Sequence, residues 1–99
     1  MKKGLTPGLE HELTRVVTRD LSVLAKRTPP VFATAEMIRL MEYAAYLLLD
    51  PFYEDHESSV GVRIEVEHLA PTPLGMRVRA LARLARIEGR RIFFELAAY

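Results

Sequence analysis

Cysteine is absent from this sequence of 99 residues. Its absence excludes disulfide bonds, thiolate catalysis and cysteine-ligated zinc, and it fits a reducing compartment. Long hydrophobic runs are also lacking: the longest apolar stretch, residues 43–49, is far too short to span a bilayer. Because no apolar stretch follows the basic N-terminus, a signal peptide is not indicated. We therefore expect a soluble, cytoplasmic protein that has no membrane partner.

A surplus of either charge is missing as well. The formal net charge is +1, which is too near zero to indicate nucleic acid by itself. The arginines of the C-terminal half are more simply a solvated sheet face than a docking site for phosphates, and they lack the aromatic interleaving of a nucleic-acid surface. The glycine-rich loops GxxxxGK and GxGxxG are missing, and the three histidines do not have metal-ligand spacing. No nucleic-acid, metal or nucleotide-loop site is indicated.

The length suits one domain covering residues 1–99. A domain this small buries only part of its unfolded surface, so a partner subunit would help to stabilise it. The clearest element is a helix over residues 34–50, which the Asp50-Pro51 pair ends. Thr34 suits the N-cap, where its hydroxyl can accept a hydrogen bond from a free backbone N–H. Apolar residues cover most of the helix circumference, which predicts burial on most sides.

Period-two alternation predicts the strands. The segment 11–18 is rich in β-branched residues, whereas residues 19–33 are less regular and contain a proline pair. Residues 59–68 alternate, with His68 on the apolar parity. Two further strands, from about residue 76 and over 90–99, are separated by a tight turn at Glu88-Gly89. One long helix over the dry face of an antiparallel sheet gives an α+β two-layer domain.

Two charged or titratable side chains stand out on this scaffold. His68 ends its strand just before a proline-rich loop, and imidazole can exchange protons near neutral pH. A histidine that simply bonds a nearby carbonyl explains the same pattern. Glu42 interrupts the apolar helix, and an unpaired buried carboxylate is costly, so a partner is expected. Arg39 could pair with it, or Glu42 could lie exposed on a narrow polar stripe.

Two smaller residues can likewise be interpreted either as structural or as ligand-binding. Thr34 is a plain helix cap, or its hydroxyl and the neighbouring N–H groups face a ligand. Gly61 lies inside a predicted strand, where glycine marks either a bulge or a close approach of a ligand to the backbone. Spacing alone leaves these alternatives open for each of the four residues.

Three stretches together resemble the fluoroacetyl-CoA thioesterase family. They are PPVFATAEMIRLMEYA, SSVGVRIEVEHLAPTPLG and RIEGRRIFFELAAY, and the resemblance covers roughly residues 28–99. The resemblance implies a hot-dog fold, in which an antiparallel sheet wraps a long central helix. It also implies a homodimer or a tetramer of such dimers, with the acyl-CoA site where two subunits meet.

The resemblance also implies the roles of individual residues. Thr34, Glu42 and His68 match catalytic positions, Gly61 matches a glycine near the thioester carbonyl, and Phe32 matches an aromatic residue beside the acyl pocket. The expected activity is hydrolysis of a small or medium acyl-CoA, without metal or prosthetic group. The alternatives are a hot-dog domain that binds acyl-CoA without hydrolysis, and a hot-dog hydratase.

One departure from the resembled family concerns the last strand. Family members continue past the equivalent of Tyr99 with a turn and a final strand that is paired on both sides. The loss of such a strand would leave unpaired edges. Either a neighbouring chain fills the place, or this sequence is a shortened form of a longer protein, and we expect the second.

Overall fold

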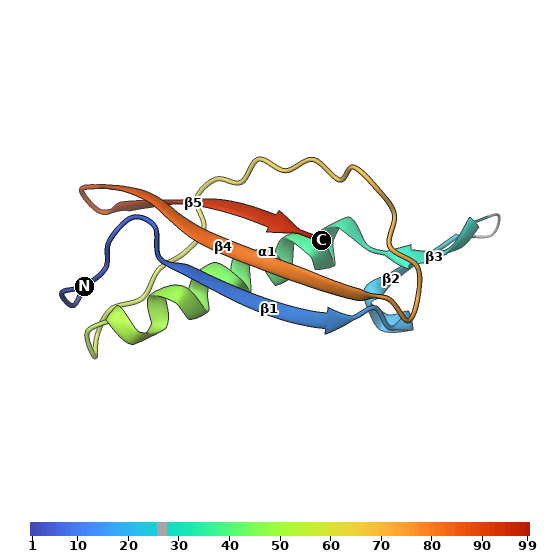
Figure 1. Cartoon of the computed structure of the whole chain (residues 1–99), viewed down its shortest axis with the longest axis horizontal. Coiled ribbons are helices and arrows are strands. Elements are labelled where there is room, and N and C mark those ends of the chain that lie inside the picture. The colour runs from blue at the N-terminus through green and yellow to red at the C-terminus, as the bar shows by residue number, and fades with distance from the viewer. Residues whose placement is uncertain (26–27) are drawn as a thin grey trace.

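The computed structural model in Figure 1 describes residues 1–25 and 28–99, and it describes side chains outside residues 23–29. The strands are β1 (Glu10–Val16), β2 (Ser22–Ala25), β3 (Thr28–Phe32), β4 (Arg77–Glu88) and β5 (Arg91–Ala98). The helices are α1 (Thr34–Leu49) and the short 3₁₀ segments η1 (Arg19–Leu21) and η2 (Asp50–Phe52). No helix among the described residues is long and apolar enough to cross a membrane.

Three antiparallel strands form the main sheet, in the order β1-β4-β5. Side chains alternate between the two faces of β4, and this alternation decides which face meets the core. On one face Val78, Ala80, Ala82 and Leu84 are buried, and on the other face the arginines between them are exposed. Gly89 has a φ of 60°, which a glycine adopts at no steric cost, and so the chain turns tightly from β4 into β5. The predictions of these two strands and of their turn are confirmed.

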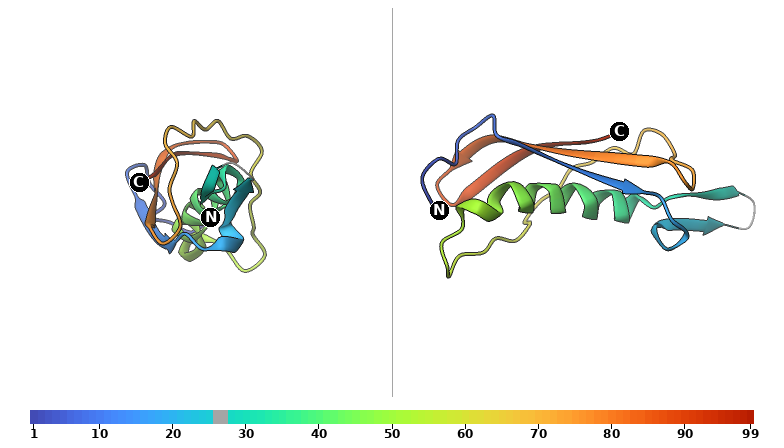
Figure 2. Two further views of the ribbon diagram at one scale, coloured as in Figure 1. Left: turned by 90° about the vertical axis from the view of Figure 1, so that its right-hand side faces the viewer. Right: turned by 60° about the horizontal axis from the view of Figure 1, so that its bottom comes forward.

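Helix α1 lies across one face of this sheet, and the end-on view in Figure 2 shows the strands curving around it. The core forms where the apolar face of α1 meets the sheet, and Ala44, Ala80 and Ala82 are fully buried there. Small side chains at these positions let the helix approach the strands closely. The α+β arrangement of one long helix on an antiparallel sheet is confirmed.

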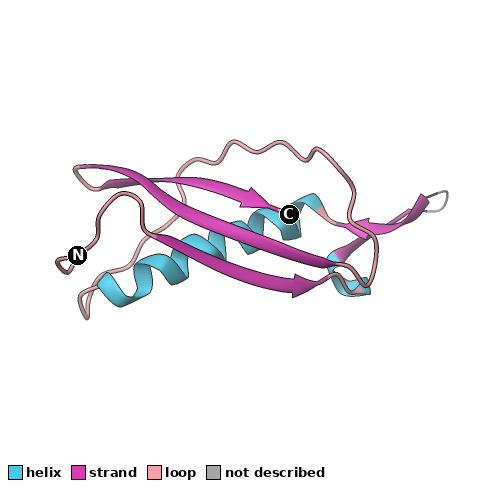
Figure 3. Ribbon diagram, viewed as in Figure 1, coloured by secondary structure: helices cyan, strands magenta, loops and turns pink. Residues whose placement is uncertain are grey.

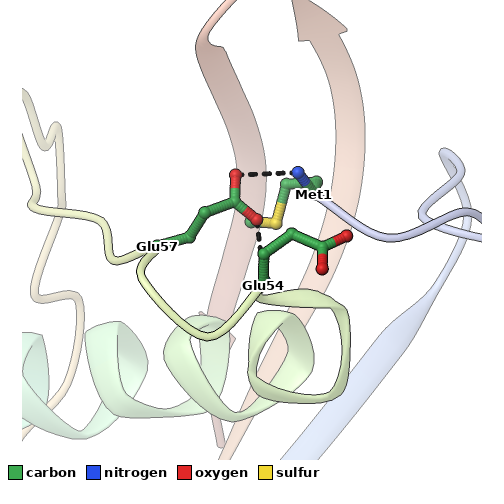
Figure 4. A network of polar contacts seen from close by, with 3 residues as sticks. All are labelled: Met1, Glu54 and Glu57. Atoms are coloured by element: carbon green, nitrogen blue, oxygen red, sulfur yellow. Dashed lines mark hydrogen bonds and ion pairs between the residues drawn. The ribbon is translucent and has the colours of Figure 1, made fainter.

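A second cluster closes the far end of the helix. Leu48, Leu49 and Leu84 are its buried members, and Leu5 and Leu9 from the N-terminal segment pack against it. The segment is held by polar contacts that Figure 4 shows: the Met1 amino group lies 2.7 Å from the Glu57 carboxylate, which also accepts a 2.8 Å bond from the Glu54 backbone N–H.

The structure corrects the prediction of a strand over residues 59–68. These residues are extended but belong to no strand, and Figure 3 draws them as loop. Among the described residues, none of their backbone groups bonds another backbone group outside the regular elements. The apolar side chains of this alternating pattern are not buried either, because Val60 and Val62 are 83% and 74% exposed. An alternating pattern predicts side-chain parity, but a strand also needs a hydrogen-bonded neighbour, and within residues 1–25 and 28–99 no strand pairs with this segment.

Other predictions need smaller corrections. The irregular stretch 19–33 contains the antiparallel pair β2–β3, so the proline pair lies in a short strand. Helix α1 is not buried on most sides, because Arg39, Glu42, Tyr43 and Tyr46 are exposed on one face. The predicted cap at Thr34 is wrong: the helix begins at Thr34, and Ala33 precedes it without a side-chain capping bond.

Candidate active site

The candidate residues from the helix lie on one ridge of α1. Thr34, Ile38 and Glu42 are each four residues apart, and residues at this spacing stand above one another on a helix face. Eight residues correspond to about 12 Å along the helix axis. The carboxylate of Glu42 and the hydroxyl of Thr34 therefore belong to two neighbouring parts of the ridge rather than to one contact.

The first contact joins the start of the helix to the end of the extended segment. Thr34 Oγ1 lies 2.6 Å from His68 Nδ1. The hydroxyl is free to make this bond because it does not cap the helix. His68 is half-buried, the least exposed residue of its segment, and Thr34 is exposed. The structure thus brings together two predicted site residues that are 34 positions apart.

The second contact joins Glu42 to Gly61. A Cβ atom placed on Gly61 would lie 3.4 Å from Glu42 Oε2, so the carboxylate lies on the side of the glycine where a side chain would project. Glu42 is exposed and, within the described part of the chain, forms no ion pair with Arg39. Of the readings that the sequence left open, an exposed position is confirmed and pairing with Arg39 is wrong.

A hollow lies between these two contacts. It has a volume of about 710 Å³ and is lined by Ile38 of the ridge and by Ile64, Glu65, Val66 and Glu67 of the extended segment. The hollow is shallow and open to solvent. The segment 59–68 thus crosses the ridge from Gly61 at Glu42 to His68 at Thr34. The sequence indicated the four polar or small residues, but it gave no signal that Ile38 would separate them.

Phe32 lies elsewhere. Its side chain is 2% exposed and belongs to the main core. It also lines a larger hollow of about 810 Å³ on the β1 side of the helix, together with Glu42, Tyr43 and Tyr46. Glu42 therefore borders both the larger hollow and Gly61, and it is the link between Phe32 and the other predicted site residues.

The sequence matches the profile of a known family over residues 14–99, described as "fluoroacetyl-CoA-specific thioesterase". A curated relative, the fluoroacetyl-CoA thioesterase of Streptantibioticus cattleyicolor, is 42% identical over 71 residues. The matched segment covers 72% of this chain and 51% of that relative, so the chain spans about half the length of the curated protein.

Solved structures of similar proteins share the fold. The fluoroacetyl-CoA thioesterase FlK superposes with a TM-score of 0.90 at 33% identity, covering 98% of this chain and 78% of that one. A hypothetical protein of Thermus thermophilus, described as a thioesterase superfamily member, gives a TM-score of 0.89 at 35% identity, covering 98% and 73%. A hot-dog-like protein of Thermanaerovibrio acidaminovorans gives 0.85 at 30% identity, covering 93% and 70%.

These matches agree with the fold and with the sequence motifs around the ridge. The hot-dog-like architecture that the motifs predicted is confirmed. With its family profile covering nearly the whole sequence, the chain belongs to the fluoroacetyl-CoA-specific thioesterase family.

Proposed function

We propose that this chain forms the catalytic domain of an acyl-CoA thioesterase, which hydrolyses a small or medium acyl-CoA to the free acid and CoA. The observation that carries the proposal is the pair of contacts along the helix ridge. Thr34 meets His68 at one end, Glu42 meets Gly61 at the other, and a hollow lies between them. A hydroxyl, an imidazole and a carboxylate along one side of the helix are the groups that thioester hydrolysis needs. The relatives' names as thioesterases support the same activity.

The thioester carbonyl needs hydrogen-bond donors to stabilise the oxyanion that forms when it is attacked. The first turn of α1 offers them, because the first N–H groups of a helix have no intrahelical acceptor. The N–H of Met37 already bonds the Ala33 carbonyl at 3.0 Å, so the groups before it are the available ones. The backbone at Gly61 is the second place where a carbonyl can approach without a side chain in its way.

Two routes of attack fit this geometry. In the first, His68 accepts the proton of the Thr34 hydroxyl, Thr34 Oγ1 bonds the acyl carbon, and the C–S bond breaks as His68 returns the proton to the CoA thiolate. Water then hydrolyses the acyl ester. In the second, Glu42 removes a proton from water that attacks the thioester directly, and His68 protonates the thiolate. Within the first route, the direct contact between Thr34 and His68 supports His68, rather than Glu42, as the base that activates Thr34.

A mass measurement under single-turnover conditions separates the two routes. An acyl adduct on the intact chain, absent from Thr34→Ala and retained in Thr34→Ser, supports the covalent route. If no adduct forms while CoA is released at the normal rate, water attacks directly.

We also propose a cytoplasmic homodimer whose site is completed across the subunit interface. The support is the segment 59–68, which presents exposed apolar side chains and backbone groups without backbone partners among the described residues. Such an edge favours pairing with another chain. Sedimentation equilibrium tests this, and a monomer at micromolar concentration contradicts it.

Release of the CoA thiol across a panel of acyl-CoA substrates tests the proposed activity, and the panel also identifies the acyl group. Steady release with at least one substrate, lost in Glu42→Gln, is the expected result. Binding without release would instead indicate an acyl-CoA-binding domain, and hydration of an enoyl-CoA would indicate a hydratase.

A further inference from the structure

The open hollow between the two contacts has side chains of two kinds in its lining. Ile38, Ile64 and Val66 are apolar, whereas Glu65 and Glu67 carry carboxylates. Among the described residues, none of the side chains that line this hollow carries a positive charge. The hollow therefore offers apolar contacts inside a negatively charged surrounding.

The position of Ile38 decides which part of a substrate meets this lining. Ile38 lies four residues from Thr34 and four from Glu42, which is about 6 Å along the helix axis from each. In either route of attack proposed above, the thioester carbonyl lies at one of these two neighbours. The phosphates of CoA are repelled by the carboxylates beside Ile38, because like charges raise the energy of binding. The acyl group, rather than the CoA arm, is therefore the part that fits over Ile38.

The carboxylates differ in how far they are neutralised. Glu65 forms an ion pair with the neighbouring Arg63, whereas Glu67 forms none within the described part of the chain. An acyl group that ends in a carboxylate of its own would bring a further negative charge beside them. An apolar acyl group removes apolar surface from water without this cost. Repulsion of the wrong ligand contributes to specificity as directly as attraction of the right one.

We propose that this hollow receives the acyl group and selects neutral, apolar acyl chains over chains that end in a carboxylate. The inference rests on the thioesterase activity proposed above and names the class of acyl-CoA that the chain accepts. Butyryl-CoA represents the accepted class. Succinyl-CoA, which has the same number of acyl carbons and a terminal carboxylate, represents the rejected class.

Calorimetric titration of the intact chain measures this selection. The ligands are thioether analogues of butyryl-CoA and succinyl-CoA, which bind without being hydrolysed. Because the CoA part is the same in both, its interactions cancel in the ratio of the two dissociation constants. We expect the butyryl analogue to bind at least about tenfold more tightly at low salt. Added salt should reduce this ratio, because Glu65 and Glu67 are exposed and their charges are screened.

Removal of the two carboxylates tests the repulsion. The double variant E65Q/E67Q should reduce the ratio at least about fivefold, through tighter binding of the succinyl analogue. The matched control E88Q/E95Q removes two exposed carboxylates that also pair with arginines, but these lie on the main sheet outside the hollow. It should leave the ratio unchanged. Circular dichroism checks that both variants are folded.

Ile38→Ala tests the apolar contribution. The smaller side chain removes contact area, so the butyryl analogue should bind about fivefold more weakly. Leu69→Ala is the control, because Leu69 is exposed and does not line the hollow. An unchanged affinity in Ile38→Ala would show that the acyl group lies elsewhere.

Equal binding of the two analogues by the parent chain, or an equal change of the ratio in E65Q/E67Q and in E88Q/E95Q, would overturn the selection. Release of CoA from butyryl-CoA and succinyl-CoA separates this inference from the proposed activity. Hydrolysis of both with the same kcat/KM would overturn the selection and keep the activity. Selective binding of the butyryl analogue without any release would support the selection and remove the activity.

Discussion

The two long sides of helix α1 are covered very differently. On one side the sheet packs against Ala44 and Leu48 and leaves almost no exposed surface. On the other side the extended segment 59–68 crosses the helix, makes a few contacts and leaves a hollow. One helix therefore serves two purposes here. Its packed side holds the fold together, and its open side holds polar side chains where a ligand can reach them.

The largest expected effect lies on the packed side. Leu84→Ala removes a fully buried side chain of the second cluster and should lower the free energy of unfolding by about 3 kcal/mol, because the space it leaves is not refilled. Leu69→Ala on the open side is the matched control: Leu69 is 86% exposed and its loss should change stability by less than about 0.5 kcal/mol. Urea denaturation of both variants measures the difference, and equal losses would remove the contrast between the two sides.

The open side should show the reverse behaviour, with large effects on catalysis. Glu42→Gln and His68→Ala are each expected to lower kcat more than about a hundredfold, because general acid–base groups contribute factors of this order. Both side chains lie outside the core, so the melting temperature should stay close to that of the parent chain. Near-normal turnover in both variants would refute their proposed roles.

A smaller effect is expected at Gly61. In Gly61→Ala the new methyl group would lie in van der Waals contact with the Glu42 carboxylate and would cover the backbone that a substrate carbonyl could otherwise approach. We expect kcat/KM to fall about tenfold, since such sites tolerate little displacement of a reacting group. Stability should hardly change, because Gly61 is exposed and its φ is not in the left-handed region. An unchanged kcat/KM would show that the contact has no catalytic purpose.

The smallest effect concerns the N-terminal segment. The amino group of Met1 and the Glu54 N–H hold the pKa of Glu57 below its ordinary value of 4.5. A carboxyl with a lowered pKa in the folded state stabilises the fold fully above its unfolded pKa, and this stabilisation is lost as the pH falls through the folded value. As the pH falls below about 4.5, the melting temperature of the parent chain should therefore decrease more than that of Glu57→Gln. An equal decrease in both chains would contradict the stabilising role of the Glu57 carboxylate.

Much of the fold follows from local patterns. The helix is predictable because its apolar residues recur at helical spacing and a proline follows Asp50, and β4 and β5 are predictable because their side chains alternate around Gly89. The same alternation fails over residues 59–68. A strand is defined by its hydrogen-bonded neighbour, and a local pattern carries no information on whether that neighbour is present.

For the site, the chemical groups are predictable from the sequence: Thr34 and Glu42 lie on the predicted helix, and His68 lies on one parity of its segment. The folded chain alone shows that Thr34 contacts His68, that Glu42 lies beside Gly61, and that Phe32 is buried apart from them. These contacts join segments far apart in the chain, and they depend on how the intervening loop closes and on which helix face the sheet has already covered.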